Sequence, residues 1–535
     1  MRNLVYRLSS SFPLTADLVR HLEGRISVFY PEEKSRLSKK VGAQLINIYA
    51  IVLVAVAILF LFADISAYYV VIGIATAYVV ADWYIHKNMN KLELKLLKEL
   101  LRFIEAVKFR FQFDGMLEEA LFDAIGNSSY IMSIHGQIMY DCLKDSYLKD
   151  KCNYEEASPN QYFLTFYSLC ESVMKYGDKK LDTGSLFLKN LGYLKEDINN
   201  HILKRNSIEN EFMGLLWICI LPIYCIKPIE MWAVGNMPEL SETYSGTMGI
   251  MITLILTALS VGIYFVISNL KYPSSLSTIR KGWVIRLERL RVIRSINAKY
   301  MNCFIKRMAK LNLLLRAVAY PYNIAQFNVK RFANSIVTGL ICGLIMLSMG
   351  FGVVCLLFVS LCTVFVFWSQ VAIIKLKKQL MLMEREDEII RFQGIILMLM
   401  HADKITVEQI LSQLERFAIN FKRDIEEISD KLSFKGMAIF KEIMSRSDFV
   451  PFNRLLEGFM ACDDMYIHKA FEDVESDRRY YIEKHKQENV HYISQRSAIG
   501  KFLSFIPICT VVIAKLVVPF VMEGMRQMAV GNMIL

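Results

Sequence analysis

Motifs that would mark an enzyme are missing from this sequence. It contains no G-x-x-x-x-G-K-[ST] loop for nucleotide phosphates, no G-x-G-x-x-G turn for a dinucleotide, no H-E-x-x-H metal motif and no G-x-S-x-G nucleophile motif. The eight histidines are dispersed, and the eleven cysteines lie singly without a C-x-x-C pair, which argues against a zinc site or a disulfide framework. The sequence therefore predicts no catalysis, no metal and no cofactor.

The composition is that of a membrane protein. Hydrophobic residues make up 54% of the 535 residues, and the mean hydropathy of +0.32 is too high for a soluble protein of this length. Charged residues still make up 21%, as in an ordinary soluble domain, so the chain must be divided into lipid-facing and water-facing parts. The net charge of +11 gathers beside the apolar stretches. It predicts an orientation in the membrane and no nucleic-acid partner.

The apolar stretches predict about seven membrane spans, because about 20 residues cross the hydrocarbon core of a bilayer. Two stretches, residues 42–85 and 334–374, are each long enough for a hairpin of two spans. Residues 212–269 hold spans three and four, and residues 501–522 form span seven.

The polar segments set the orientation. They are an N-terminal segment at 1–41, large charged regions at 86–211 and 375–500, a basic linker at 270–333 and a tail at 523–535. The N-terminal segment and the linker are rich in Lys and Arg, whereas the turns after spans one, three and five contain neither. Because loops rich in Lys and Arg stay inside, we expect a cytoplasmic N-terminus, two cytoplasmic charged regions and a C-terminus outside.

Both charged regions have the period of amphipathic helices. The stripe in the first region comprises Leu97, Leu100, Leu101 and Ile104, and the stripe in the second comprises Ile389, Ile390, Ile396 and Leu397. We expect each stripe to form the core of a helical bundle. Thr406 and Gln409 have the spacing of a capping box, which predicts a helix start. Strand patterns are absent, so the expected fold is an all-α integral membrane protein.

The two halves of the chain resemble each other. ELLRF at 99–103 and EIIRF at 388–392 follow the two predicted hairpins at an offset of 289, and AVGNM occurs at both 233–237 and 529–533. We interpret this as an internal duplication of a unit that contains a span hairpin, a cytoplasmic bundle and a return span. The alternative is that any two membrane hairpins look alike, which accounts for the apolar runs but not for AVGNM.

Six charged residues are candidates for function. Glu99, Arg102, Glu388 and Arg391 lie outside the apolar stripes, where they form either a solvated helix face or a surface for a cytoplasmic partner. Lys227 and Lys515 lie within predicted spans, where ionisable residues mark function by default. Lys227 lies close to Glu230, and we expect its side chain to extend to the outer interface. For Lys515, that reading and an intramembrane contact with another helix both stay open.

The layout resembles the F-type platform proteins of type II secretion and type IV pilus systems, GspF and PilC, and resembles most closely a fused pair of TadB and TadC. The matching features are the two helix-turn-helix starts at 99–121 and 388–411, the charged runs before the return spans, and the prolines within those spans. The chain departs from the pattern at Lys404, where the family often has Gly, and in having both halves in one chain.

This resemblance implies two cytoplasmic bundles of antiparallel helices in a prokaryotic cytoplasmic membrane protein. It also implies a platform that couples a cytoplasmic assembly ATPase to pilin or pseudopilin assembly, as a homo-oligomer without catalysis of its own. On this reading Glu99, Arg102, Glu388 and Arg391 face the ATPase. Two alternatives stay open, a polytopic small-molecule transporter and a membrane signalling scaffold.

Overall fold

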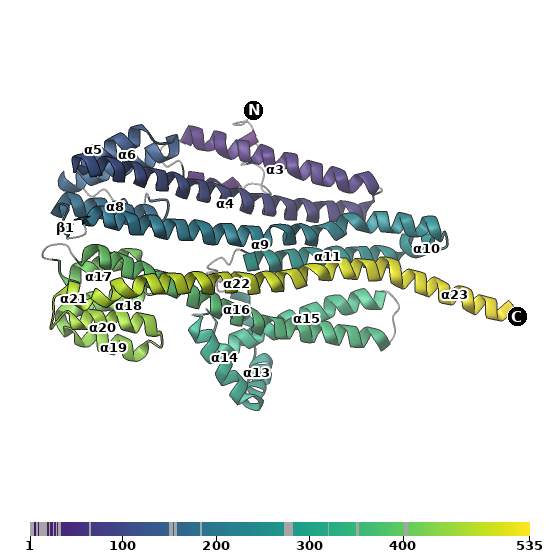
Figure 1. Ribbon diagram of the computed structural model, residues 1–535. Coiled ribbons are helices and arrows are strands. Elements are labelled where there is room, and N and C mark those ends of the chain that lie inside the picture. The colour runs from purple at the N-terminus through teal and green to yellow at the C-terminus, as the bar shows by residue number, and fades with distance from the viewer. Residues whose placement is uncertain are drawn as a thin grey trace. The chain divides into compact units, whose positions relative to one another are not determined.

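The computed structural model describes residues 34–534 apart from 64–65, 149–153, 155–157, 182–183, 272–281, 319, 321, 349–352 and 401–404, together with scattered residues between 5 and 29. The described residues are almost entirely helical (Figure 1). They form two compact units. Unit 1 comprises Met1–Ile220 and Glu388–Leu503, and unit 2 comprises Leu221–Asp387 and Ser504–Leu535.

Unit 1 begins with an apolar helical hairpin. Helices α3 (Lys34–Phe62) and α4 (Ala67–Asp114) pack together through a cluster that includes Val41, Leu45 and Ile85. The 48 residues of α4 form one unbroken helix, which is about 72 Å long at 1.5 Å per residue. Helix α4 therefore contains the predicted second span and also the first helix of the predicted first bundle.

In the described part of the first bundle, three further helices precede the long helix α9 (Leu186–Asn236). They are α5 (Leu117–Gly126), α6 (Tyr130–Leu148) and α8 (Gln161–Tyr176). Gly115 ends α4 with a φ of 68°, a left-handed conformation that glycine adopts without strain. An antiparallel pair of two-residue strands, β1 (Lys180–Leu181) and β2 (Gly184–Ser185), precedes α9. This pair is too short to form a layer, so the architecture is helical, as expected.

The second bundle extends from the end of α16 (Val353–Leu399) to α22 (Glu472–Val512). Its other helices are α17 (Val407–Phe417), α18 (Lys422–Lys435), α19 (Ala438–Arg446), α20 (Val450–Ala461) and the short α21 (Ile467–Ala470). The predicted capping box is confirmed, because Thr406 accepts from the backbone N–H of Gln409 and the Gln409 side chain accepts from the backbone N–H of Thr406.

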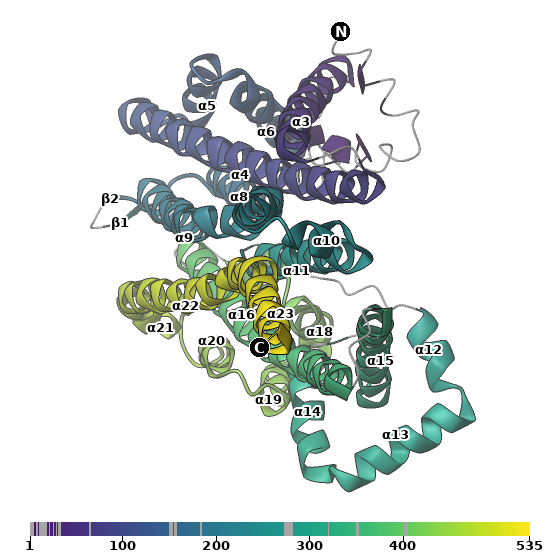
Figure 2. The ribbon, with the colours of Figure 1, turned by 90° about the vertical axis from the view of Figure 1, so that its right-hand side faces the viewer.

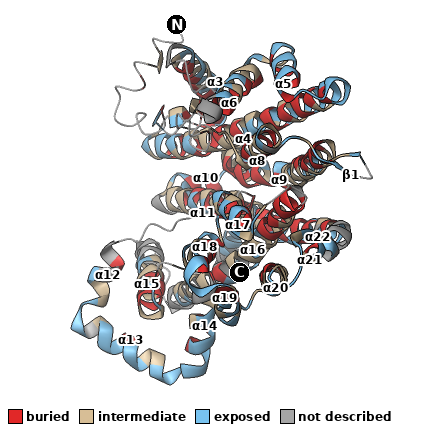
Figure 3. Ribbon diagram, turned by 90° about the vertical axis from the view of Figure 1, so that its left-hand side faces the viewer, coloured by how far each residue is buried: buried red, intermediate tan, exposed pale blue. Residues whose placement is uncertain are grey.

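The two bundles share one apolar core. Most members of both predicted stripes are buried in it, namely Leu97, Leu100 and Ile104 from α4, and Ile389, Ile396 and Leu397 from α16. Leu101 and Ile390 are half-buried. Burial of one Leu or Ile side chain stabilises the fold by roughly 1.5–3 kcal/mol, so the stripes specify the packing as predicted. Figure 3 shows buried residues along α4, α8 and α9.

One cysteine in this unit departs from the sequence expectation. Cys142 in α6 is disulfide-bonded, whereas the scattered cysteines were expected to be unpaired. Sequence spacing does not show which side chains the fold brings together, so it gives no sign of this bond.

Unit 2 contains the second part of α9 and a series of helices that follow it. They are α10 (Leu240–Ser245), α11 (Thr247–Lys271), α12 (Gly282–Glu288), α13 (Arg291–Cys303), α14 (Ile305–Ala317) and α15 (Ile324–Ser348). The last part of the unit contains the π-helical turn η1 (Ile513–Val517) and α23 (Val518–Ile534). Figure 2 shows α12, α13 and α14 joined end to end beside α15.

Five stretches of the described residues are long and apolar enough to cross a membrane. They are Arg36–Phe62, Ala67–Asp114, Leu186–Asn236, Gly249–Lys271 and Ile482–Met528. They indicate a multi-pass membrane protein. Helices α15 and α16 contain the predicted spans five and six, but residues 349–352 between them lie outside the described part of the chain. A total of seven spans therefore stays a prediction.

The helix order of the two halves is similar only in part. Between the long entering helix and the long leaving helix, the described residues form three helices in the first bundle and five in the second. The second helices, α5 and α17, have 10 and 11 residues. Lys404, where the resembled family often has Gly, lies outside the described residues. The duplication also stays a prediction.

Candidate functional site

A buried pair of opposite charges lies among the apolar helices of unit 2. The Lys515 Nζ donates to Glu230 Oε1 at 2.6 Å, and the two side chains are only 1% and 8% exposed. The same Nζ donates to the backbone carbonyl of Gly249 at 3.0 Å, and it lies 5.5 Å from the ring centroid of Tyr244. Lys515 is therefore buried against α9 and α11, and a location of this contact within the membrane stays a prediction.

Proline explains the local geometry around Lys515. In an α-helix its carbonyl would accept from the N–H of residue 519, but Pro519 has none. The chain forms the π-helical turn η1 here, and the Tyr244 hydroxyl donates to the Lys515 carbonyl at 2.6 Å. The turn is thus stabilised from outside its own helix. Both the cation and the carbonyl of Lys515 have partners close to the connection between α9 and α11.

Gly249 allows the close approach that this arrangement needs. A Cβ added at Gly249 would lie 2.2 Å from the backbone oxygen of Tyr244, so another residue would displace α11 or α10. Because Gly249 has no side chain, its carbonyl is accessible to Lys515. Gly249 and Tyr244 could not be predicted from the sequence, because neither residue type carries a signal for such a contact.

The pair belongs to a three-charge cluster with one excess positive charge. The Lys227 Nζ lies 3.9 Å from Glu230 Oε2, and the Lys227 side chain is 22% exposed. This contact is longer than a hydrogen bond, so Glu230 interacts mainly with Lys515. A charged side chain in a bilayer is costly unless it is paired. The Lys515–Glu230 contact offsets that cost for both groups.

Glu230 and Gly249 lie near the ends of their helices, whereas the turn that contains Lys515 continues directly into α23. Glu230 is six residues before Asn236, the last residue of α9, which is about 9 Å at 1.5 Å per residue. Gly249 is in the first turn of α11.

The structure contradicts the sequence prediction for Glu388, one of the four charged residues that lie outside the apolar stripes. We expected it on an outward helix face, but its side chain is fully buried. Its Oε1 accepts from the backbone N–H groups of Ile419 and Phe421 at 2.7 and 3.2 Å, and its Oε2 accepts from that of Asn420 at 2.8 Å. These donors immediately precede α18, so Glu388 acts as an anionic cap from a distant part of the chain. It is unavailable to a partner.

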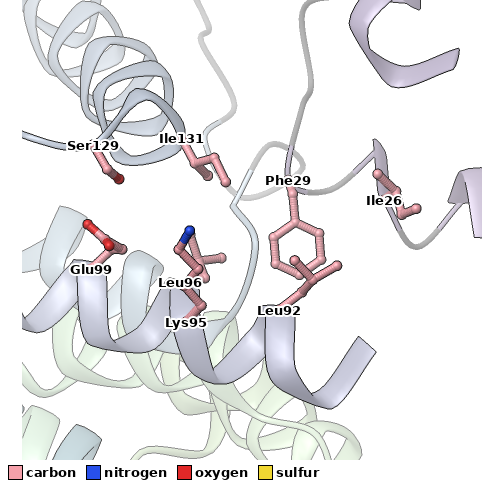
Figure 4. Close-up of a pocket in the computed structure, with 8 residues that line it drawn as sticks. All are labelled: Ile26, Phe29, Leu92, Lys95, Leu96, Glu99, Ser129 and Ile131. Atoms are coloured by element: carbon pink, nitrogen blue, oxygen red, sulfur yellow. The ribbon is translucent and has the colours of Figure 1, made fainter. Parts of the chain in front are cut away.

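The other three charges differ in exposure. Arg102 is 77% exposed and lies 3.7 Å from Glu99. Glu99 is half-buried and lines a small pocket, where its carboxylate points toward the Ser129 hydroxyl (Figure 4). Arg391 is half-buried, and its Nε has no hydrogen-bond partner in the described structure. Of the four predicted surface residues, Arg102 alone is fully exposed.

His135 is a buried titratable group that the sequence did not single out. It lies in α6 with neither ring nitrogen hydrogen-bonded to a described residue, and its ring is 5.5 Å from that of Phe163. Burial lowers the pKa of His135 to about 4, because the charged imidazolium would lose its hydration. The imidazole is therefore uncharged at pH 7, and its ring packs in the interior beside Phe163.

No group of three His, Cys, Asp or Glu side chains within the described ranges could hold a metal ion. No protein family, curated protein or solved structure matches this chain. Fold and candidate site together define its class as a helical multi-pass membrane protein with a buried ion pair.

Proposed function

We propose that this protein is the membrane platform of a type IV pilus, Tad-like or type II secretion-like machine. In this role it crosses the cytoplasmic membrane of a prokaryote about seven times, with its N-terminus inside and its C-terminus outside. It couples a cytoplasmic assembly ATPase to the assembly of pilin or pseudopilin subunits, and it works as a homo-oligomer. The sequence resemblance motivates the proposal.

The observation that carries the proposal is the unbroken helix α4. Its 48 residues extend about 72 Å, whereas the hydrocarbon core of a membrane is about 30 Å thick. The remaining length carries Leu97, Leu100 and Ile104 into the core of the bundle. A rigid element that joins a span to a water-exposed bundle is suited to transmit movement from a cytoplasmic motor to the membrane.

Contacts between the two bundles support a single motor-facing body. Arg416 in α17 lies 3.6 Å from Glu171 in α8, and Glu211 in α9 accepts from Ser497 in α22 at 2.7 Å. These pairs accompany the shared apolar core. A push on either bundle would therefore reach both α4 and α22.

Copurification tests this function. A cytoplasmic assembly ATPase encoded beside this protein should copurify with the full-length chain, and Arg102→Glu should weaken that association at least tenfold without loss of expression or membrane insertion. Arg423 in α18 is also exposed, and Arg423→Glu makes the same charge change as a control. An ATPase that never associates, together with normal filament assembly in a deletion strain, would reject the platform function.

A transporter is the second candidate, because the Lys515–Glu230 pair is buried within apolar helices and buried intramembrane charges often line substrate paths. Purified protein in liposomes would then take up a solute in an ion-dependent manner. The two large bundles favour the platform.

A further inference from the structure

The chain between α11 and α16 contains a continuous basic stretch. No Asp or Glu occurs from residue 289 to residue 383, and ten Lys or Arg residues lie between 289 and 331. Helices α13 and α14 fall within this stretch. Loops beside membrane spans are commonly basic, and here neither α13 nor α14 contains an acidic residue.

Helix α13 combines these cations with exposed apolar side chains. Arg291, Arg294 and Lys299 are exposed, and so are Ile296 and the following Phe304, at 58% and 42%. Figure 3 shows α13 largely exposed, and in Figure 2 no other helix of unit 2 covers its side away from α15. Helix α13 therefore exposes both cations and apolar side chains, and it contains no acidic residue.

Ring contacts place α13 at the level of the membrane boundary. The Tyr300 ring lies 5.1 Å from Phe332 and 6.3 Å from Phe367. Phe332 comes two residues before the predicted fifth span, and Phe367 is in the apolar part of α16. Trp368 beside it is 65% exposed, and aromatic residues gather at the membrane–water interface.

Asn297 fixes the rotation of α13 about its axis. Its side chain is buried and donates to the backbone carbonyl of Ala325 in the first turn of α15 at 3.0 Å. Ile296 precedes Asn297 by one residue and is therefore turned about 100° away from α15. It cannot be buried by the helix that α13 packs against.

We propose that α13 is an interfacial helix that binds an anionic phospholipid surface. Phosphate groups of the lipids contact Arg291, Arg294 and Lys299, while Ile296 and Phe304 insert at the boundary between headgroups and acyl chains. An acidic partner protein would fit the cations, but it would not account for the apolar residues at membrane level. This inference is independent of the platform function, because it requires only that the neighbouring apolar helices span a bilayer.

The test uses the full-length protein in lipid nanodiscs. Cys303 on α13 is exposed, and it carries a spin label in a variant whose other cysteines are replaced and whose thermal unfolding matches the natural protein. In nanodiscs that contain phosphatidylglycerol, the label should be accessible to oxygen and shielded from a water-soluble nickel reagent. In pure phosphatidylcholine the shielding should decrease.

Charge reversal provides the matched comparison. Arg291→Glu, Arg294→Glu and Lys299→Glu together should reduce the membrane partitioning of α13 by more than roughly a hundredfold, because loss of each surface cation alone is worth about fivefold and the new carboxylates add repulsion. Reversal of three exposed cations in the second bundle, Arg423, Lys441 and Lys469, should leave the label unaffected. A label equally exposed to the nickel reagent in both lipids would overturn the inference. So would shielding that requires an added protein, which would assign the surface to an acidic partner.

Discussion

Removal of the Lys515 cation should destabilise the protein far more than removal of the whole ion pair. In Lys515→Met, the 8% exposed carboxylate of Glu230 keeps only Lys227, whose Nζ is 3.9 Å from Oε2. Leaving one partner of a buried pair uncompensated costs about 3–5 kcal/mol. In Lys515→Met/Glu230→Leu no buried charge is left from the pair, so we expect a change within about 1 kcal/mol of the natural protein.

Reversible unfolding in mixed micelles measures both free energies, and the two single variants with the double variant form a cycle. The expected coupling energy between Lys515 and Glu230 is at least about 2 kcal/mol. A Lys515→Met variant that loses less than about 1 kcal/mol would mean that the lysine extends to water, and the reasoning would fail. A stable double variant that no longer supports filament assembly would assign the pair a role beyond stability.

Three further predictions concern unit 1 and the topology. Glu388→Gln should lower the free energy of unfolding by about 2–4 kcal/mol, because a neutral amide replaces an anion that accepts three backbone N–H bonds, whereas Glu99→Gln should cost below about 0.5 kcal/mol. A larger loss for Glu99 in chemical unfolding would contradict this. His135 has a folded pKa of about 4, and the unfolded chain, with its pKa near 6.5, binds more protons between these values. The free energy of unfolding should thus fall by up to about 3 kcal/mol from pH 7 to pH 4, and His135→Phe should remove that part of the slope. Cysteines introduced at Ser241 and Ile534 should react with an impermeant maleimide from outside intact cells, and labelling only after permeabilisation would refute the orientation.

The sequence predicts helix positions correctly where apolar periodicity and local capping determine them. Leu97 and Leu100 are buried as their spacing predicts, and the Thr406 capping box forms because both of its partners are local. Glu388 was misplaced because its partners, the N–H groups before α18, are 31 to 33 residues away. Periodicity assigns a residue to a helix face, but it does not show that another segment covers that face.

The Lys515–Glu230 pair also depends on residues that are far apart in the sequence. Lys515 was a candidate because a charged residue in an apolar run is conspicuous. Its partner Glu230 is 285 residues away, and only the packing of α9 beside the last apolar helix brings them together. Pro519 was visible in the sequence, yet its consequence for the Lys515 carbonyl became clear only with the Tyr244 hydroxyl in place.

Glu99 and Glu388 begin the similar sequences ELLRF and EIIRF, and their surroundings bear on the proposed duplication. Glu388 caps the connection before α18, and its first donor, Ile419, lies 31 residues further along the chain. Glu99 points toward Ser129 in Figure 4, and Ser129 and Ile131 in the same pocket are 30 and 32 residues further along, where α6 begins.

In each bundle, then, the glutamate of the first helix faces the start of the third helix at nearly the same sequence distance. Two unrelated hairpins would share this spacing only by chance, whereas two copies of one ancestral bundle would retain it. The difference in detail is also informative. The Glu388 carboxylate accepts three backbone N–H hydrogen bonds. Glu99 instead lines a small pocket and lies beside the exposed Arg102. If the halves are copies, the second bundle uses this glutamate to cap a helix, whereas in the first bundle it is paired with the exposed Arg102.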